Sequence, residues 1–82
     1  MMPIRNLQNL KSGESGRISQ IDGGYGMVNR LAALNIRPGK LITKLNSGIM
    51  RGPITIELDR TQVAIGFGMA KRILVDVEDV VK

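Results

Sequence analysis

The sequence predicts a mainly β fold: a small barrel of about five strands with one inserted α-helix and a short helical turn. Short runs of alternating apolar and polar residues are separated by turns rich in glycine and proline. A single run carries apolar residues at helical spacing. The chain has 82 residues, too few to cover the edges of a flat sheet. Closing the sheet into a barrel removes those edges.

The N-terminal part of the chain predicts a helical turn followed by a strand. Leu7 and Leu10 are three residues apart, which places both on one side of a turn that lies over the core. Residues 17–21 then read as a strand. Ile18 and Ile21 differ in parity, so this strand needs a bulge, a twist or burial on both faces.

After a glycine-rich break, one amphipathic helix of roughly ten residues is predicted. Its apolar positions are Met27, Val28, Leu31, Ala32 and Leu34. Of these, we assign Met27, Val28 and Leu31 to core packing. The end of the helix is strongly marked: Asn35 can take the left-handed conformation, Ile36 can fold back onto the last turn, and Pro38 prevents continuation.

The remaining residues predict four further strands, at residues 40–45, 54–58, 61–65 and 73–77. In the first of them, Lys40, Ile42 and Lys44 face one way and the intervening residues face the other. The second and third form a hairpin with its turn at residues 59–60. Residues 66–72 allow only a single helical turn.

We therefore expect one SH3-like domain over residues 1–82, with its core at about residues 7–77 and a tail at residues 78–82. Glycine and proline at the ends of the strands suit the tight corners of such a barrel. These corner residues are Gly16, Gly39, Gly52, Pro53 and Gly66.

The composition argues against an enzyme. Histidine and cysteine are both absent, which removes the usual general base, the usual thiol nucleophile and the two best ligands for transition metals. We expect no cofactor and no disulfide. Only Tyr25 and Phe67 are aromatic, too few for a platform that stacks bases. No apolar run approaches the roughly 20 residues that span a bilayer, and no secretory signal is present, so we expect a cytoplasmic protein without membrane insertion.

The net charge of +5 and the pI of about 10.3 favour acidic partners, yet the twelve Lys and Arg are scattered along the chain. Four of them follow one another on the predicted helix and the strand after it: Arg30, Arg37, Lys40 and Lys44. They either form one positive face that steers an acidic partner or only keep the protein in solution.

Two other segments are candidate sites. The loop residues Ile49, Met50 and Arg51 lie between two glycines, where they can anchor a partner or fold back over the barrel mouth. Asp76, Glu78 and Asp79 are an acidic group that either holds a hard cation or is solvated; no metal ligand can be assigned.

The glycine cluster at residues 23–26 precedes the helix. It either holds an anion or makes a tight turn between strand and helix. Its spacing does not match a dinucleotide-binding fingerprint. We favour the turn.

One chain-long pattern of apolar, glycine and proline residues resembles the ferrous iron transport protein A (FeoA) family. It comprises Leu7-x-x-Leu10-x-x-Gly13-x-x-Gly16-x-Ile18, Gly23-Gly24, Leu31-x-x-Leu34-Asn35-Ile36-x-Pro38-Gly39, Gly52-Pro53 and Ala64-x-Gly66-x-x-x-Ala70-x-x-Ile73-x-Val75. It covers about residues 7–77. The family usually has glycine where this chain has Asn35, and asparagine is the next best residue for a left-handed helix end.

The resemblance implies an SH3-like barrel in bacterial or archaeal cytoplasm, in a family associated with transition metals. It also implies that the protein docks on the cytoplasmic GTP-binding portion of the FeoB membrane transporter and modulates it. The alternatives are a nucleic-acid-binding small barrel, motivated by the net charge, or a free-standing relative of the C-terminal SH3-like domain of iron-dependent repressors. We expect no sequence-specific contact with nucleic acid. The sequence is compatible with a homo-oligomer as well as with a monomer.

Overall fold

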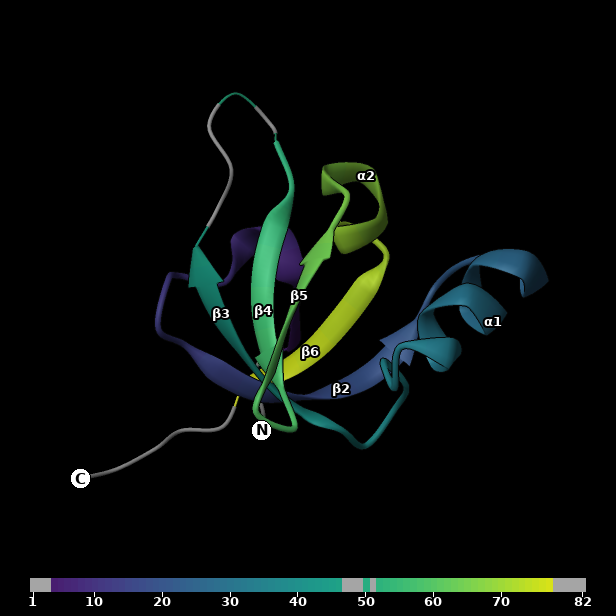
Figure 1. Cartoon of the computed structure of the whole chain (residues 1–82), viewed down its shortest axis with the longest axis horizontal. Coiled ribbons are helices and arrows are strands. Elements are labelled where there is room, and N and C mark those ends of the chain that lie inside the picture. The colour runs from purple at the N-terminus through teal and green to yellow at the C-terminus, as the bar shows by residue number, and fades with distance from the viewer. Residues whose placement is uncertain (1–3, 47–49, 51, 78–82) are drawn as a thin grey trace.

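The computed structural model describes residues 4–46, 50 and 52–77. In chain order the elements are β1 (Ile4–Asn6), the 3₁₀ turn η1 (Leu7–Asn9), β2 (Ser15–Ile21), α1 (Tyr25–Ala33), β3 (Leu41–Asn46), β4 (Ile54–Leu58), β5 (Thr61–Ile65), α2 (Phe67–Ala70) and β6 (Ile73–Val77) (Figure 1).

Within the described residues, the strands form one antiparallel sheet of six, in the order β1-β6-β2-β3-β4-β5. Figure 1 shows this sheet curling on itself, with α1 set to one side beyond the end of β2. The short helix α2 joins β5 to β6. The architecture is mainly β and SH3-like, as the sequence predicts.

Most elements match the sequence prediction, and one was missed. The hairpin strands β4 and β5, the last strand β6 and the helical turns at η1 and α2 are confirmed. The register shift between Ile18 and Gln20 confirms that β2 needs an irregularity. The sequence predicts about five strands, and the structure adds a sixth, Ile4–Asn6, paired with β6. Three residues are too few for an alternating pattern that predicts a strand, and their partner strand lies about seventy positions away in the sequence.

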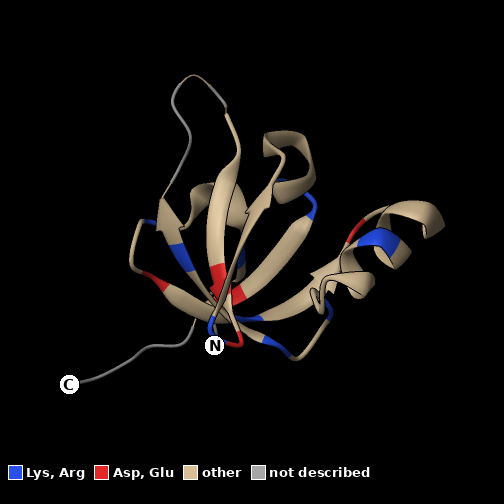
Figure 2. Cartoon of the chain, viewed as in Figure 1, with Lys and Arg blue, Asp and Glu red and all other residues tan. Residues whose placement is uncertain are grey.

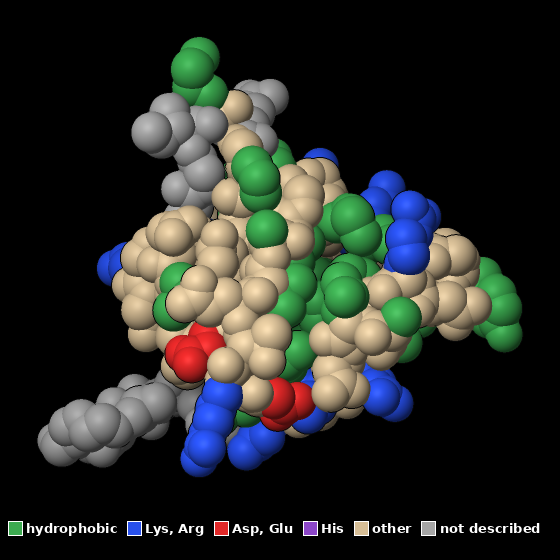
Figure 3. All heavy atoms as spheres, viewed as in Figure 1, with side chains coloured by type: hydrophobic (Ala, Val, Ile, Leu, Met, Phe, Trp, Pro, Cys, Tyr) green, Lys and Arg blue, Asp and Glu red, His purple; other side chains and the backbone are tan. Residues whose placement is uncertain are grey.

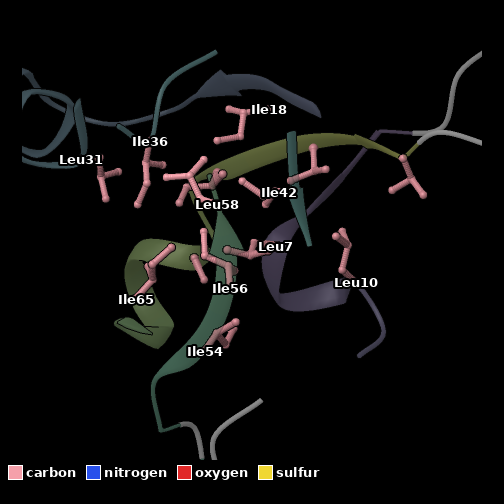
Figure 4. Close-up of a cluster of buried hydrophobic side chains, with 14 residues drawn as sticks. Leu7, Leu10, Ile18, Leu31, Ile36, Ile42, Ile54, Ile56, Leu58 and Ile65 are labelled. Atoms are coloured by element: carbon pink, nitrogen blue, oxygen red, sulfur yellow. The ribbon is translucent and has the colours of Figure 1, made fainter. Parts of the chain in front are cut away.

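Buried aliphatic side chains fill the inside of the curled sheet (Figure 4). Alternate residues of β4 (Ile54, Ile56, Leu58) and of β6 (Ile73, Val75, Val77) are buried, as the period of a strand requires. Leu7 and Leu10 cover one end of this core from η1 and the residue after it. The sequence prediction for these two leucines is confirmed.

Gly16 allows two strands to approach closely. A Cβ at this position would lie 2.6 Å from Val75 Cγ1 and 2.7 Å from the carbonyl oxygen of Asp76. Those separations are shorter than van der Waals contact, so any side chain at Gly16 would push β2 away from β6.

The end of α1 is formed as the sequence predicts. Asn35 has a φ of 70° and donates its N–H to Ala32 O at 2.9 Å, while Ile36 donates its N–H to Leu31 O at 2.9 Å. These two bonds are a Schellman motif. Leu31 and Ile36 are buried and lie beside each other in Figure 4. Of the three apolar residues that we assigned to the core, only Leu31 is buried; Met27 packs partly against the core and Val28 is half-buried.

We expect Leu31→Ala to lower the free energy of unfolding by roughly 2–5 kcal/mol, because it leaves a cavity where α1 meets the core. Denaturant unfolding measures this loss. The half-buried Val28, on the same helix, provides the control: Val28→Ala costs far less. Equal stability of Leu31→Ala and the wild type would contradict the packing described above.

Candidate docking surface

The four basic residues singled out in the sequence do not form one face. Arg30 on α1 and Arg37 in the following connection are exposed, and Lys40 is partly exposed. Lys44 is only 1% exposed, so its place on a partner-binding face is wrong. The inward side of β3 carries Ile42 and Lys44, because a strand alternates its side chains and Ile42 belongs to the core.

The ammonium group of Lys44 binds the backbone of the N-terminal turn. Its Nζ donates to the carbonyl oxygens of Leu7 (3.3 Å), Gln8 (3.1 Å) and Leu10 (2.6 Å). Leu7 O also accepts the N–H of Leu10 at 3.3 Å, whereas the last carbonyls of a helical turn lack partners within it. An ammonium group offers three donors. Lys44 therefore holds η1 against β3 and has a structural role.

The charged side chains of Glu14 and Arg5 lie at the same end of the barrel as Lys44. Burial lowers the pKa of Lys44, and the Glu14 carboxylate partly opposes that shift. The pKa of Glu14 is lowered mainly by the backbone N–H of Lys11, which donates to Oε1 at 2.7 Å, with help from Arg5 at 3.1 Å. The N-terminal segment is thus held by contacts on both sides of η1.

Arg37 and Lys40 join a polar group at the tip of the β4–β5 hairpin. Asp59 Oδ2 lies 2.8 Å from Lys40 Nζ and accepts a hydrogen bond of 3.2 Å from Asn35 Nδ2. Arg37 Nη2 in turn donates to Asn35 Oδ1 at 2.9 Å. The helix end and the hairpin tip are thereby connected, and Arg30 lies outside this group.

The hairpin tip is a two-residue turn in which Asp59 (φ 52°) and Arg60 (φ 65°) are both left-handed. This is the type I′ geometry of tight hairpins. Sequence reasoning placed the turn but did not anticipate its contact with Asn35. That contact depends on how the curled sheet brings residues 35 and 59 together.

A hollow lined by hydrophobic side chains lies between the β4–β5 side of the barrel and α1 (Figure 3). The elements that border it carry apolar side chains that are only partly buried against the core. These are Ile21 at the end of β2, Met27 on α1, Val63 on β5 and Phe67 on α2. Leu34, just after α1, is half exposed. An apolar surface of this kind can receive a partner's side chains.

Of the candidate loop, only Met50 is described. It is 93% exposed, with a φ of 55°. Ile49 and Arg51 lie outside the described residues. The exposed thioether of Met50 is free to contact a partner, and Met adapts to irregular surfaces.

The acidic group is described only at Asp76, since Glu78 and Asp79 lie outside the described residues. Asp76 Oδ1 is buried and accepts no hydrogen bond within the described part of the chain. Residues 4–46, 50 and 52–77 contain no group of three or more His, Cys, Asp or Glu that could hold a metal ion.

The glycine cluster at residues 23–26 lies at the start of α1, where Gly24 is the N-cap of the helix.

Neither of the two described helices has the length and apolar character needed to cross a membrane.

The family model described as "FeoA domain" matches residues 5–77. The chain is 32% identical over 66 residues to "Putative Fe(2+) transport protein A" of Methanocaldococcus jannaschii, covering 80% of this chain and 78% of the relative. A crystal structure of "Iron Uptake Regulatory Protein (FeoA)" superposes with a TM-score of 0.80 at 32% identity, covering 89% of this chain and 95% of that one.

A manganese-dependent transcriptional repressor superposes with a TM-score of 0.85 at 24% identity, covering 95% of this chain and 44% of the repressor. At this identity the likeness is one of fold. It shows that the same barrel occurs as part of a longer protein.

The buried ammonium predicts a pH dependence. Because the pKa of Lys44 is lower in the folded state than its ordinary value of 10.5, the unfolded chain keeps this proton to higher pH. The free energy of unfolding should therefore gain a contribution as pH rises from the lowered pKa towards 10.5.

Lys44→Met should remove that alkaline contribution and lower stability at neutral pH by about 1–3 kcal/mol, since buried carbonyls lose their donor. The exposed Lys71, changed to Met, is the control. Urea unfolding between neutral pH and pH 10.5 measures both effects. An identical pH profile in wild type and Lys44→Met would contradict the assignment.

Proposed function

The chain belongs to the FeoA family, which takes part in Fe(2+) transport, and from this premise we propose that it is a small cytosolic accessory protein of ferrous iron uptake. It docks on the cytoplasmic GTP-binding portion of a FeoB-like membrane transporter and modulates it. The observation that carries the proposal is the match to the FeoA domain over residues 5–77, which includes all but the first residue of the described sheet.

The surface supports action by docking. Arg30 and Arg37 are exposed, and the chain carries a net charge of +5. Such charges raise the rate at which an acidic partner associates. The partly buried apolar side chains beside α1 offer the desolvated contact area that stabilises a complex after the encounter.

Binding to the purified FeoB cytoplasmic region should be measurable by pull-down and by calorimetry, with GTP analogues, with GDP and without nucleotide. We expect binding in at least one nucleotide state and an association rate that falls as salt is added, because the attraction is partly electrostatic. Absence of binding in every nucleotide state contradicts the proposal. Tight binding of RNA or DNA with a steep salt dependence would favour the nucleic-acid alternative instead.

Met50→Glu should weaken FeoB binding without unfolding the domain, because an exposed apolar anchor becomes charged. We expect a loss of about tenfold or more in affinity, with an unchanged thermal midpoint. Ser12→Glu adds the same charge at another exposed turn and is the matched control. If the two variants bind equally well, the loop at residues 49–51 has no part in docking.

A further inference from the structure

We propose that the free edge of β5 receives the partner, and that the partner supplies an extended segment of apolar residues flanked by acidic ones as an additional strand. This inference rests on the proposed docking function and specifies its mode. Recognition by strand addition takes its affinity from main-chain hydrogen bonds and its specificity from alternate side chains.

The pairing of β5 leaves one of its edges open. β5 is the last strand in the order of the sheet and, among the described residues, pairs with β4 alone. The two-residue turn makes Leu58 and Thr61 a hydrogen-bonded pair. By alternation, Val63 and Ile65 also bond to β4, while Gln62 and Ala64 turn their backbone N–H and C=O groups away from it.

Those outward groups have no partner in the described part of the chain. Neither the backbone nor the side-chain hydrogen bonds of the described residues include Gln62 or Ala64. Both residues are exposed. The edge therefore offers two N–H donors and two C=O acceptors at the spacing that an antiparallel strand requires.

The hollow beside this edge can take the side chains of an added strand. Figure 3 shows its apolar lining between the β4–β5 side and α1. The elements that border it carry partly buried apolar side chains packed against the core: Val63 on β5, Phe67 on α2 and Met27 on α1. Because successive side chains of a strand point in opposite directions, every second residue of the added segment would face this lining. Those residues are expected to be apolar.

Basic residues flank the edge at both of its ends. Arg60 adjoins the start of β5 in the hairpin turn, and Lys71 and Arg72 precede β6, beyond α2. Figure 2 shows the basic positions at the start of β6 and on α1, where the one basic residue is Arg30. An acidic segment is therefore attracted to this surface.

One nearby carboxylate is already neutralised, because Asp59 Oδ2 lies 2.8 Å from Lys40 Nζ. Glu57, opposite Gln62 on β4, is exposed and keeps a negative charge beside the edge. A second copy of this chain, with a net charge of +5, would place like charges opposite one another. Charge complementarity thus favours an acidic partner segment over self-association.

The other end of the sheet is less suited to this role. β1 has only three residues, and its Arg5 is engaged by Glu14 across a distance of 3.1 Å. Short edge strands are a common protection against pairing. β5 has five residues and two open backbone positions.

The test removes one edge donor without touching the β4 ladder. Ala64→Pro deletes the outward N–H, and proline is tolerated on an edge strand where that group faces solvent. We expect a thermal midpoint close to that of the wild type and a loss of about tenfold or more in affinity for the FeoB cytoplasmic region. Ala64→Val keeps the N–H and should bind like the wild type.

A second measurement does not depend on how well the proline variant folds. Hydrogen exchange of wild-type protein, followed by NMR, should show new protection of the Gln62 and Ala64 amides on adding the FeoB region. A synthetic peptide of alternating valine and glutamate should protect the same two amides, and its lysine counterpart should not. This peptide arm tests the edge even if FeoB does not bind.

The outcomes separate the inference from the function on which it rests. If FeoB binds wild type and Ala64→Pro equally well and leaves both amides unprotected, strand addition is overturned while docking stands. If FeoB does not bind but the glutamate peptide protects both amides, the edge stands and the FeoB proposal fails. A wild-type dimer that Ala64→Pro converts to monomer, seen by analytical ultracentrifugation, would assign the edge to a second copy and overturn the inference.

Discussion

The contact between the buried ammonium of Lys44 and the backbone of η1 is the interaction on which one end of the barrel depends. Burying a charge is costly unless it is fully hydrogen-bonded, and three carbonyl oxygens meet that requirement. Leu7 and Leu10 are thereby held over the core, and the chain before them continues into β1, which pairs with β6. Because its ammonium group is buried in these contacts, Lys44 does not contribute to the charged surface.

At the opposite side, a second set of polar contacts positions the candidate docking surface. The Schellman motif ends α1 and buries Ile36, and the Asn35 side chain then reaches Asp59 at the hairpin tip. Since Lys40 binds the same carboxylate, the start of β3, the end of α1 and the β4–β5 turn are connected. α1 itself buries only Leu31. Its position beside the barrel, and hence the hollow between them, relies on this helix end.

We propose that this small curled sheet acts through its outer surface. A chain of 82 residues has a thin core. Its sequence contains no histidine and no cysteine. Membership of the FeoA family supplies the setting, ferrous iron transport. The molecule supplies an apolar hollow, exposed cations and an open strand edge. Strand addition uses all three at once, because the edge fixes register, the hollow takes side chains and the cations select acidic flanks.

The amino-acid order by itself determined the local elements: the alternation of β4, β5 and β6, the helical spacing of α1, and its end at Asn35 and Ile36. These depend on neighbours within a few positions, so their signals are legible in the sequence. Tertiary structure alone decided the side of β3 that is buried, and hence the structural role of Lys44. It also decided the pairing of β1, the meeting of Asn35 with Asp59 and the open edge of β5. Each of these depends on residues brought together from distant parts of the chain, and alternation states which side chains share a face but not which face is buried.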